Sequence, residues 1–285
     1  MSIACQLRDL DWAVKSPLLM SEGPVLEDLD LCQVDPAHLA AFLNAVTSRR
    51  VGRYFERLIL YWLQHVRAAR IVAESLPIRD HQRTLGEIDF LFYDEREQFT
   101  HWETAVKFYL HYPRENASGS HYIGPNAADT FERKTARLLE QQLPLSEIHF
   151  PEVAVRQAFV KGRIFYHPHL GPPTYQPQHL APDHLRGIWI RASELASLQE
   201  PGEAKYRILQ KPFWLAEGTV GDPDTGVFLL PDLEQLLAKH FADFSYPVLI
   251  SRLADPRQPL LKPTHIFVVS ESWPEPPAAN RTTPG

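Results

Sequence analysis

Apolar residues recur every three or four positions in the first quarter of the chain, and this spacing predicts amphipathic helices. Residues 51–69 carry such a stripe, which begins at Phe55. A helix is also predicted for residues 35–48, because Asp35 is a favoured N-cap residue. Residues 1–34 contain prolines and little regular spacing, so they are predicted to be an irregular N-terminal segment.

A different pattern follows, in which short apolar runs are bounded by polar turns and predict strands. These runs cover residues 71–76, 85–93 and 100–110, and the last two form a hairpin around the polar turn at 94–98. A helix with many basic residues is then predicted for residues 129–143. Residues 153–165 predict either a strand pair or one bent strand.

The order of these elements defines the expected organisation of the chain. Helix, three strands, helix and strand over residues 35–166 predict an α/β core with a mixed sheet. Residues 167–186 are rich in proline and are predicted to be a loop or linker. Strand and helix patterns predict an α+β extension over residues 187–270, and residues 271–285 are predicted to be a disordered tail.

Acidic side chains and one lysine gather on one face of the predicted hairpin. Because side chains alternate along a strand, a turn near Arg96 brings Asp89 opposite Glu103, with Lys107 farther along. Glu56 lies on the partly apolar stripe of the preceding helix and can point toward the sheet. Half-buried carboxylates cost free energy unless a cation or substrate compensates them, which favours a functional site. A structural ion pair between Asp89 and Lys107 is the alternative.

Three short motifs resemble those of a known nuclease superfamily. They are Gly-Arg-Tyr-Phe-Glu at residues 52–56, Gly-Glu-Ile-Asp-Phe at 86–90 and Glu-Thr-Ala-Val-Lys-Phe-Tyr-Leu at 103–110. With the αβββαβ order, the chain resembles the PD-(D/E)XK nuclease-like superfamily over about residues 50–165. More narrowly, it resembles an uncharacterised bacterial domain-of-unknown-function family assigned to that superfamily. The resemblance implies a restriction-endonuclease-like core.

The resemblance also implies metal-dependent hydrolysis of phosphodiester bonds in DNA, with Mg²⁺ or Mn²⁺ as the cofactor. Asp89, Glu103 and Glu56 would be the metal ligands, directly or through water. Lys107 would orient or deprotonate the attacking water, or stabilise negative charge on the phosphate. Substrate contacts are expected from the basic helix at Lys134, Arg137 and Gln141, with Gln142 as the alternative glutamine. The charges of this helix also fit a simple solvated face.

One departure from the superfamily pattern leaves a second hypothesis open. Ala105 stands where the second motif has its acidic residue, and Glu103 lies roughly 6.5 Å farther along the strand. This favours a catalytically inactive nuclease-fold module that binds nucleic acid or protein. A third hypothesis is an interaction protein with an exposed apolar patch around Trp189 or Trp214.

Composition bears on the cellular location that we expect for the protein and on the partners that it binds. A net charge of −6 gives no global basic field, so nucleic-acid binding requires a local basic patch. Cys5 and Cys32 have no metal-ligand spacing and follow no signal peptide, so reduced thiols and a cytoplasmic location are expected. No uncharged apolar run approaches the roughly 20 residues of a membrane-spanning helix. No phosphate loop, dinucleotide fingerprint or serine-hydrolase elbow occurs, which excludes those enzyme classes.

Overall fold

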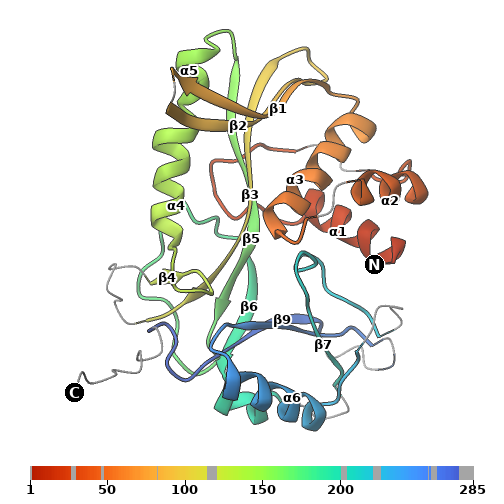
Figure 1. Cartoon of the computed structure of the whole chain (residues 1–285), viewed down its shortest axis with the longest axis vertical. Coiled ribbons are helices and arrows are strands. Elements are labelled where there is room, and N and C mark those ends of the chain that lie inside the picture. Colours follow the sequence, from red (N-terminus) through yellow and green to blue (C-terminus); the bar gives the residue numbers. More distant parts are fainter. Residues whose placement is uncertain are drawn as a thin grey trace, which may run out of the picture.

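The chain forms a mixed α/β fold, as predicted. A computed structural model describes residues 2–26, 30–45, 48–81, 83–113, 121–199, 204–220, 226–255, 257 and 262–275. These residues build a nine-stranded mixed sheet with helices on both of its faces (Figure 1). The strand order is β1-β2-β3-β5-β6-β9-β8-β7, and the short strand β4 pairs with β3.

The helices and strands have the following bounds. The helices are α1 (Ile3–Lys15), α2 (Pro36–Asn44), α3 (Val51–Tyr61), α4 (Phe131–Arg137), α5 (Leu145–His149) and α6 (Leu230–Asp243). The π-helical turns η1 (Trp62–Val66) and η2 (Leu138–Gln142) continue α3 and α4, and η3 (Ala192–Leu198) is a 3₁₀ helix. The strands are β1 (Arg70–Asp80), β2 (Arg83–Tyr93), β3 (Phe99–His111), β4 (Tyr122–Ile123), β5 (Val155–Tyr166), β6 (Leu185–Arg191), β7 (Tyr206–Ile208), β8 (Val248–Arg252) and β9 (Thr264–Val269). Within the described part of the chain, none of the helices has the length and apolar character needed to cross a membrane.

The N-terminal segment differs from its prediction, because residues 3–15 form helix α1 rather than irregular chain. Ser2 caps this helix and accepts a hydrogen bond from the backbone of Cys5. The buried face of α1 includes polar Asp9, whose carboxylate accepts hydrogen bonds from Tyr54 Oη at 3.0 Å and from the backbone of Ala216 at 3.1 Å. Tertiary hydrogen bonds allow this polar residue to be buried on the inner face. The stripe of apolar residues is therefore interrupted, and apolar spacing alone did not reveal the helix.

Helices on both faces enclose the central strands. Helices α1 to α3 cover one face of β3 and β5, and α4 covers the other (Figure 1). On the first face, Phe55 of α3 packs with Trp102 and Phe159 of the strands. On the second face, Phe131 of α4 packs against Tyr109. Strand β3 therefore lies in the interior of the molecule, and polar side chains on it are enclosed.

The sheet continues from the predicted core into the C-terminal third. Strands β5 and β6 pair in parallel across the proline-rich segment, and β9 pairs in parallel with β6. Trp189 of β6 is fully buried against Trp273, so it does not form the exposed patch that would have supported the third hypothesis. Trp214 is only partly buried. The buried Trp273 shows that the start of the predicted tail packs on the fold as far as residue 273, and residues 276–285 lie outside the described residues.

Residues 155–166 form one strand, which settles the alternative that the sequence left open. Gly162 has a φ of 154° and pairs with Lys107 of β3. A Cβ atom at this position would lie 1.9 Å from the carbonyl oxygen of Lys107. The glycine thus permits β5 to approach β3 beside the candidate site.

We expect Gly162→Ala to lower the free energy of unfolding by more than about 3 kcal/mol, because the new methyl group overlaps backbone atoms at an unfavourable φ. Gly171→Ala is the matched control, since Gly171 also has a positive φ of 63° but no atom within 4 Å of an added Cβ. That control should cost only about 1 kcal/mol. Urea unfolding measures both values, and similar losses would contradict the close approach at Gly162.

Candidate functional site

Strands β2 and β3 form the predicted hairpin and separate at Asp89. Their pairing runs from Tyr93↔Phe99 to Phe90↔Trp102 and stops there. Beyond that point, the backbone N–H of Thr104 donates to Asp89 Oδ2 at 2.8 Å, and the N–H of Asp89 donates to Glu103 Oε1 at 3.4 Å. Each carboxylate thus accepts from a backbone group of the opposite strand, which holds both side chains where the strands diverge.

Glu103 is fixed by a chain of hydrogen bonds and is only 1% exposed. His101 Nε2 lies 2.9 Å from Glu103 Oε1, and Gln142 Nε2 donates to Oε2 at 2.8 Å. His101 Nδ1 in turn lies 2.7 Å from Ser146 Oγ, which accepts from Arg156 Nε at 3.0 Å. These contacts keep the carboxylate in one orientation.

The electrostatics of this carboxyl pair are unfavourable without a cation or a proton. Burial raises the pKa of both Asp89 and Glu103, and the neighbouring charge of Glu103 raises the pKa of Asp89 further. Two adjacent carboxylates in a poorly solvated place repel each other, so ionisation of both together is unfavourable without a cation. Burial, and secondly the charge of Arg156, lowers the pKa of His101 to about 4, so this imidazole is neutral at pH 7.

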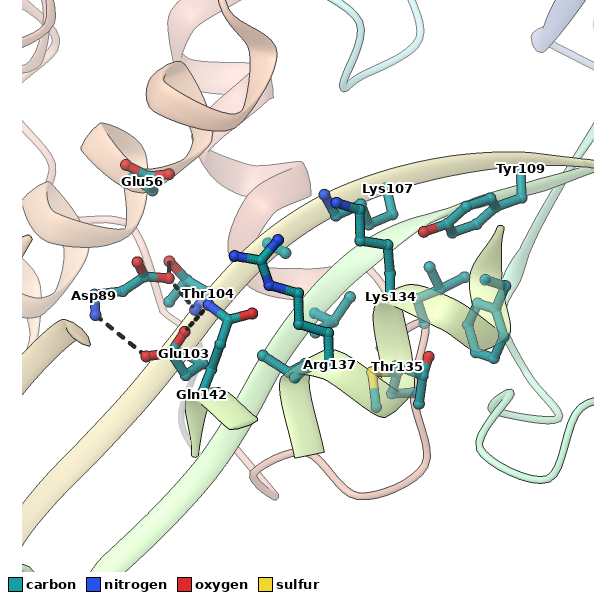
Figure 2. Close-up of a pocket in the computed structure, with 16 residues that line it drawn as sticks. Glu56, Asp89, Glu103, Thr104, Lys107, Tyr109, Lys134, Thr135, Arg137 and Gln142 are labelled. Carbon is teal, nitrogen blue, oxygen red and sulfur yellow. Dashed lines mark hydrogen bonds between the residues drawn. The ribbon is translucent and has the colours of Figure 1, made fainter. Parts of the chain in front are cut away.

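The carboxyl pair lines a cavity of about 260 Å³ (Figure 2). The predicted site residues that line it are Glu56, Asp89, Glu103, Lys107, Lys134 and Arg137. Burial lowers the pKa of Lys107, and the nearby charge of Lys134 lowers it further. Figure 2 shows the Lys107 and Lys134 side chains on one side of the carboxyl pair, with Arg137 between. The cavity therefore contains acidic groups from β2 and β3 together with basic groups from β3 and α4.

Gln142, not the predicted Gln141, enters the cavity. The physical reason is the π-helical turn η2, in which the backbone of Leu143 donates to Leu138 O at 3.0 Å. In a regular α-helix, residue 141 lies on the same side as Lys134, two turns earlier. The wider π turn adds one residue, so Gln142 takes that place and Gln141 is exposed.

Glu56 lines the cavity from α3 but lies apart from the carboxyl pair (Figure 2). Arg53 Nη1 donates to its Oε2 at 2.7 Å. Across the described residues, no three His, Cys, Asp or Glu side chains are grouped so as to hold a metal ion. A cation here would therefore rest chiefly on Asp89 and Glu103. That set fits Mg²⁺, which often binds through one or two carboxylates and retains several waters.

The sequence pattern missed two polar residues of the site, His101 and Tyr109. His101 supports Glu103, and the hydroxyl group of Tyr109 is buried at the cavity without a hydrogen-bond partner among the described residues. Both lie at even spacing from Glu103 and Lys107 on β3. Side-chain alternation identified Glu103 and Lys107, and extending it by two residues in each direction along β3 would have found His101 and Tyr109.

Comparisons with known proteins identify the family. No curated protein and no solved structure matches the chain. A family model matches residues 8–269, which run from helix α1 to the end of strand β9 and include every candidate site residue. The match spans far more than half of the chain, and the protein therefore belongs to the family described as domain of unknown function (DUF1853).

Proposed function

We propose that the protein is a divalent-cation-dependent phosphodiesterase that cleaves DNA through a site of the PD-(D/E)XK type. The observation that carries this proposal is a pair of carboxyl groups, the half-buried Asp89 and the buried Glu103, beside basic side chains in one cavity. The order α3-β1-β2-β3-α4-β5 supports a restriction-endonuclease-like core. The bacterial origin and the cytoplasmic location expected from the sequence belong to the same proposal. Cleavage of DNA with Mg²⁺ or Mn²⁺, compared with EDTA, is the direct test.

Asp89 and Glu103 would hold the cation, Mg²⁺ or Mn²⁺, with Glu56 contributing through water. Among the described residues, Asp89 Oδ1 has no hydrogen-bond partner, which leaves it available as a ligand. A bound cation would also offset the repulsion that raises the pKa of Asp89 beyond the effect of burial. When bound, the cation would supply Lewis-acid polarisation of a phosphoryl oxygen.

The basic side chains have distinct roles in this proposal. Lys107 lies on β3 in the cavity, and its lowered pKa leaves a larger fraction of the amine unprotonated, and so able to accept a proton, than in an exposed lysine at the same pH. It would orient the attacking water and, when protonated, stabilise charge that develops on the phosphate. Lys134 and Arg137 would neutralise the phosphate groups of the substrate.

A specific observation also favours the inactive binding module as a second candidate. Ala105 lines the cavity where the superfamily motif has a carboxylate, and both oxygens of Glu103 already accept hydrogen bonds. Such a module would bind nucleic acid or protein without a cation. Calorimetric titration with Mn²⁺ separates the two candidates, because only the enzyme requires a bound cation.

We expect Gln142→Ala to weaken Mn²⁺ binding by about 10- to 100-fold, because the variant loses a hydrogen bond that orients Glu103. Gln141→Ala is the matched control and should bind Mn²⁺ like the wild-type protein, since Gln141 is exposed and does not line the cavity. Isothermal titration calorimetry measures both affinities. Equal effects of the two substitutions would contradict the role given to Gln142.

A further inference from the structure

Two cavities meet at the candidate carboxylates. The cavity of about 260 Å³ and a second one of about 470 Å³ share Glu56 and Asp89 in their linings. The second cavity is also lined by three arginines, which are Arg53 and Arg57 of α3 and Arg50 just before it. The exposed Glu74 of β1 lines it as well. The two cavities thus share acidic residues, and the lining of each also contains basic residues of its own.

The first cavity has a buried donor that the fold itself does not use. Tyr109 is 2% exposed, and its hydroxyl group has no hydrogen-bond partner in the described part of the chain. Figure 2 shows this hydroxyl directed into the cavity, beyond Lys107 as seen from Asp89. Lys134 lies beside it with only a distant ion pair, 3.8 Å from Asp129. A buried hydroxyl without a partner is unfavourable unless a ligand supplies an acceptor.

The second cavity also has donors that the fold leaves available. Arg53 is occupied, because its Nη1 atom donates to Glu56 and to Ser75, each at 2.7 Å. Arg57 stacks its guanidinium 4.0 Å from the centre of the Phe42 ring and donates one long hydrogen bond, from Nη2 to Phe42 O at 3.5 Å, while its buried Nε has no partner among the described residues. The Arg50 side chain is exposed and forms no ion pair with any described residue. Guanidinium groups of this kind suit phosphate oxygens.

We propose that an extended single strand of nucleic acid crosses Asp89, with its phosphates held by Tyr109 and Lys134 on one flank and by Arg50 and Arg57 on the other. The inference rests on the proposed function for the identity of the substrate. It deepens that function, because a strand held on both flanks presents an internal phosphodiester bond to the carboxylates rather than a chain end.

The confined carboxylates select a single strand over a duplex. Glu103 is 1% exposed, and the cavity of about 260 Å³ lies below the roughly 300–1,000 Å³ of common ligand pockets. The backbone of a flexible single strand can enter such a space. A rigid duplex is wider, because its second strand must move with the first, and it does not fit. Single strands are bound by positively charged grooves that follow the backbone, as the two flanks would do here.

Binding of a fluorescently labelled single strand of about 12 nucleotides, followed by anisotropy in EDTA, tests the inference without cleavage. Tyr109→Phe removes only the unpartnered hydroxyl, so the variant should fold like the wild-type protein. Arg50→Gln/Arg57→Gln removes two charges from the other flank. Arg79→Gln/Arg83→Gln is the matched control, because these exposed arginines of β1 and β2 line neither cavity. Thermal melting confirms that each variant is folded.

We expect Tyr109→Phe to weaken binding several-fold and the Arg50/Arg57 double variant to weaken it by about tenfold or more. The salt dependence of the double variant should fall by about 1.4 in slope, roughly 0.7 for each lost phosphate contact on a single strand. The control should bind like the wild-type protein. Three results would each overturn the inference. They are unchanged binding by both flank variants (Tyr109→Phe and Arg50→Gln/Arg57→Gln), an equal loss of binding in the control, and tighter binding of a duplex of the same length.

The outcomes also separate this inference from the proposed function. In one outcome, the flank variants lose binding and the wild-type protein cleaves nothing with Mg²⁺ or Mn²⁺. This would support the strand path, the proposed course of a single strand across Asp89, and refute the phosphodiesterase. Metal-dependent cleavage with unchanged binding by the flank variants would support the phosphodiesterase and refute the strand path.

Discussion

Asp89→Asn is expected to lower the rate of metal-dependent DNA cleavage by at least about a thousandfold. The substitution retains the shape of the side chain and an acceptor for the Thr104 backbone N–H, but it removes the charge that a cation requires. A thousandfold loss corresponds to about 4 kcal/mol of transition-state stabilisation, which is of the size that a bound metal ion supplies. Initial cleavage rates at saturating Mn²⁺ measure this effect.

The same substitution should not destabilise the fold. Burial and the charge of Glu103 raise the pKa of Asp89, so its ionised form is unfavourable in the folded protein. A neutral amide removes that repulsion, and we expect the Asp89→Asn variant to melt at the same temperature or higher without metal. A variant that cleaved DNA at the wild-type rate would refute the role of Asp89, whatever its stability.

Lys107→Met is expected to lower the cleavage rate by about 10²- to 10⁴-fold, the range associated with loss of a proton-transfer group or of a donor to developing charge. Methionine retains the apolar length of this half-buried side chain, so the packing against β3 persists. Mn²⁺ affinity should be unchanged or tighter, because Lys107 is not a ligand and its positive charge opposes a cation. Single-turnover rates and calorimetric titration separate the two effects.

Lys239→Met on α6 is the matched control for this prediction, since Lys239 is exposed and does not line the carboxylate cavity. It should cleave DNA at the wild-type rate. If Lys107→Met abolished Mn²⁺ binding instead of the chemical step, Lys107 would organise the site and would not act on water or phosphate.

The hairpin and its charged face were predictable because they follow from a local rule. Side chains alternate along a strand, so the positions of Asp89 and Glu103 on β2 and β3 fix their proximity once the turn at residues 94–98 is recognised. The helix N-cap at Asp35 is equally local and has the predicted hydrogen bond, 2.8 Å from its Oδ1 to the backbone of Ala37. Such features need no knowledge of distant residues.

The features that escaped prediction depend on tertiary structure. The inner face of α1 buries Asp9 through partners about 45 and 207 residues away in the chain, which no local pattern records. The π turn that selects Gln142 over Gln141 shifts the helical phase by one residue, and apolar spacing does not mark such a turn. The pairing of β5 with β6 across the proline-rich segment is likewise non-local, so the sequence did not show one continuous sheet.

The most direct test of the phosphodiesterase is to incubate the purified protein with single- and double-stranded DNA and RNA in the presence of Mg²⁺, Mn²⁺ or EDTA. Denaturing gels would follow the products. The proposed function predicts cleavage of DNA that requires the cation, stops in EDTA and is lost in the Asp89→Asn variant. Intact substrates under every condition, with no Mn²⁺ binding by calorimetry, would contradict it and favour the inactive binding module.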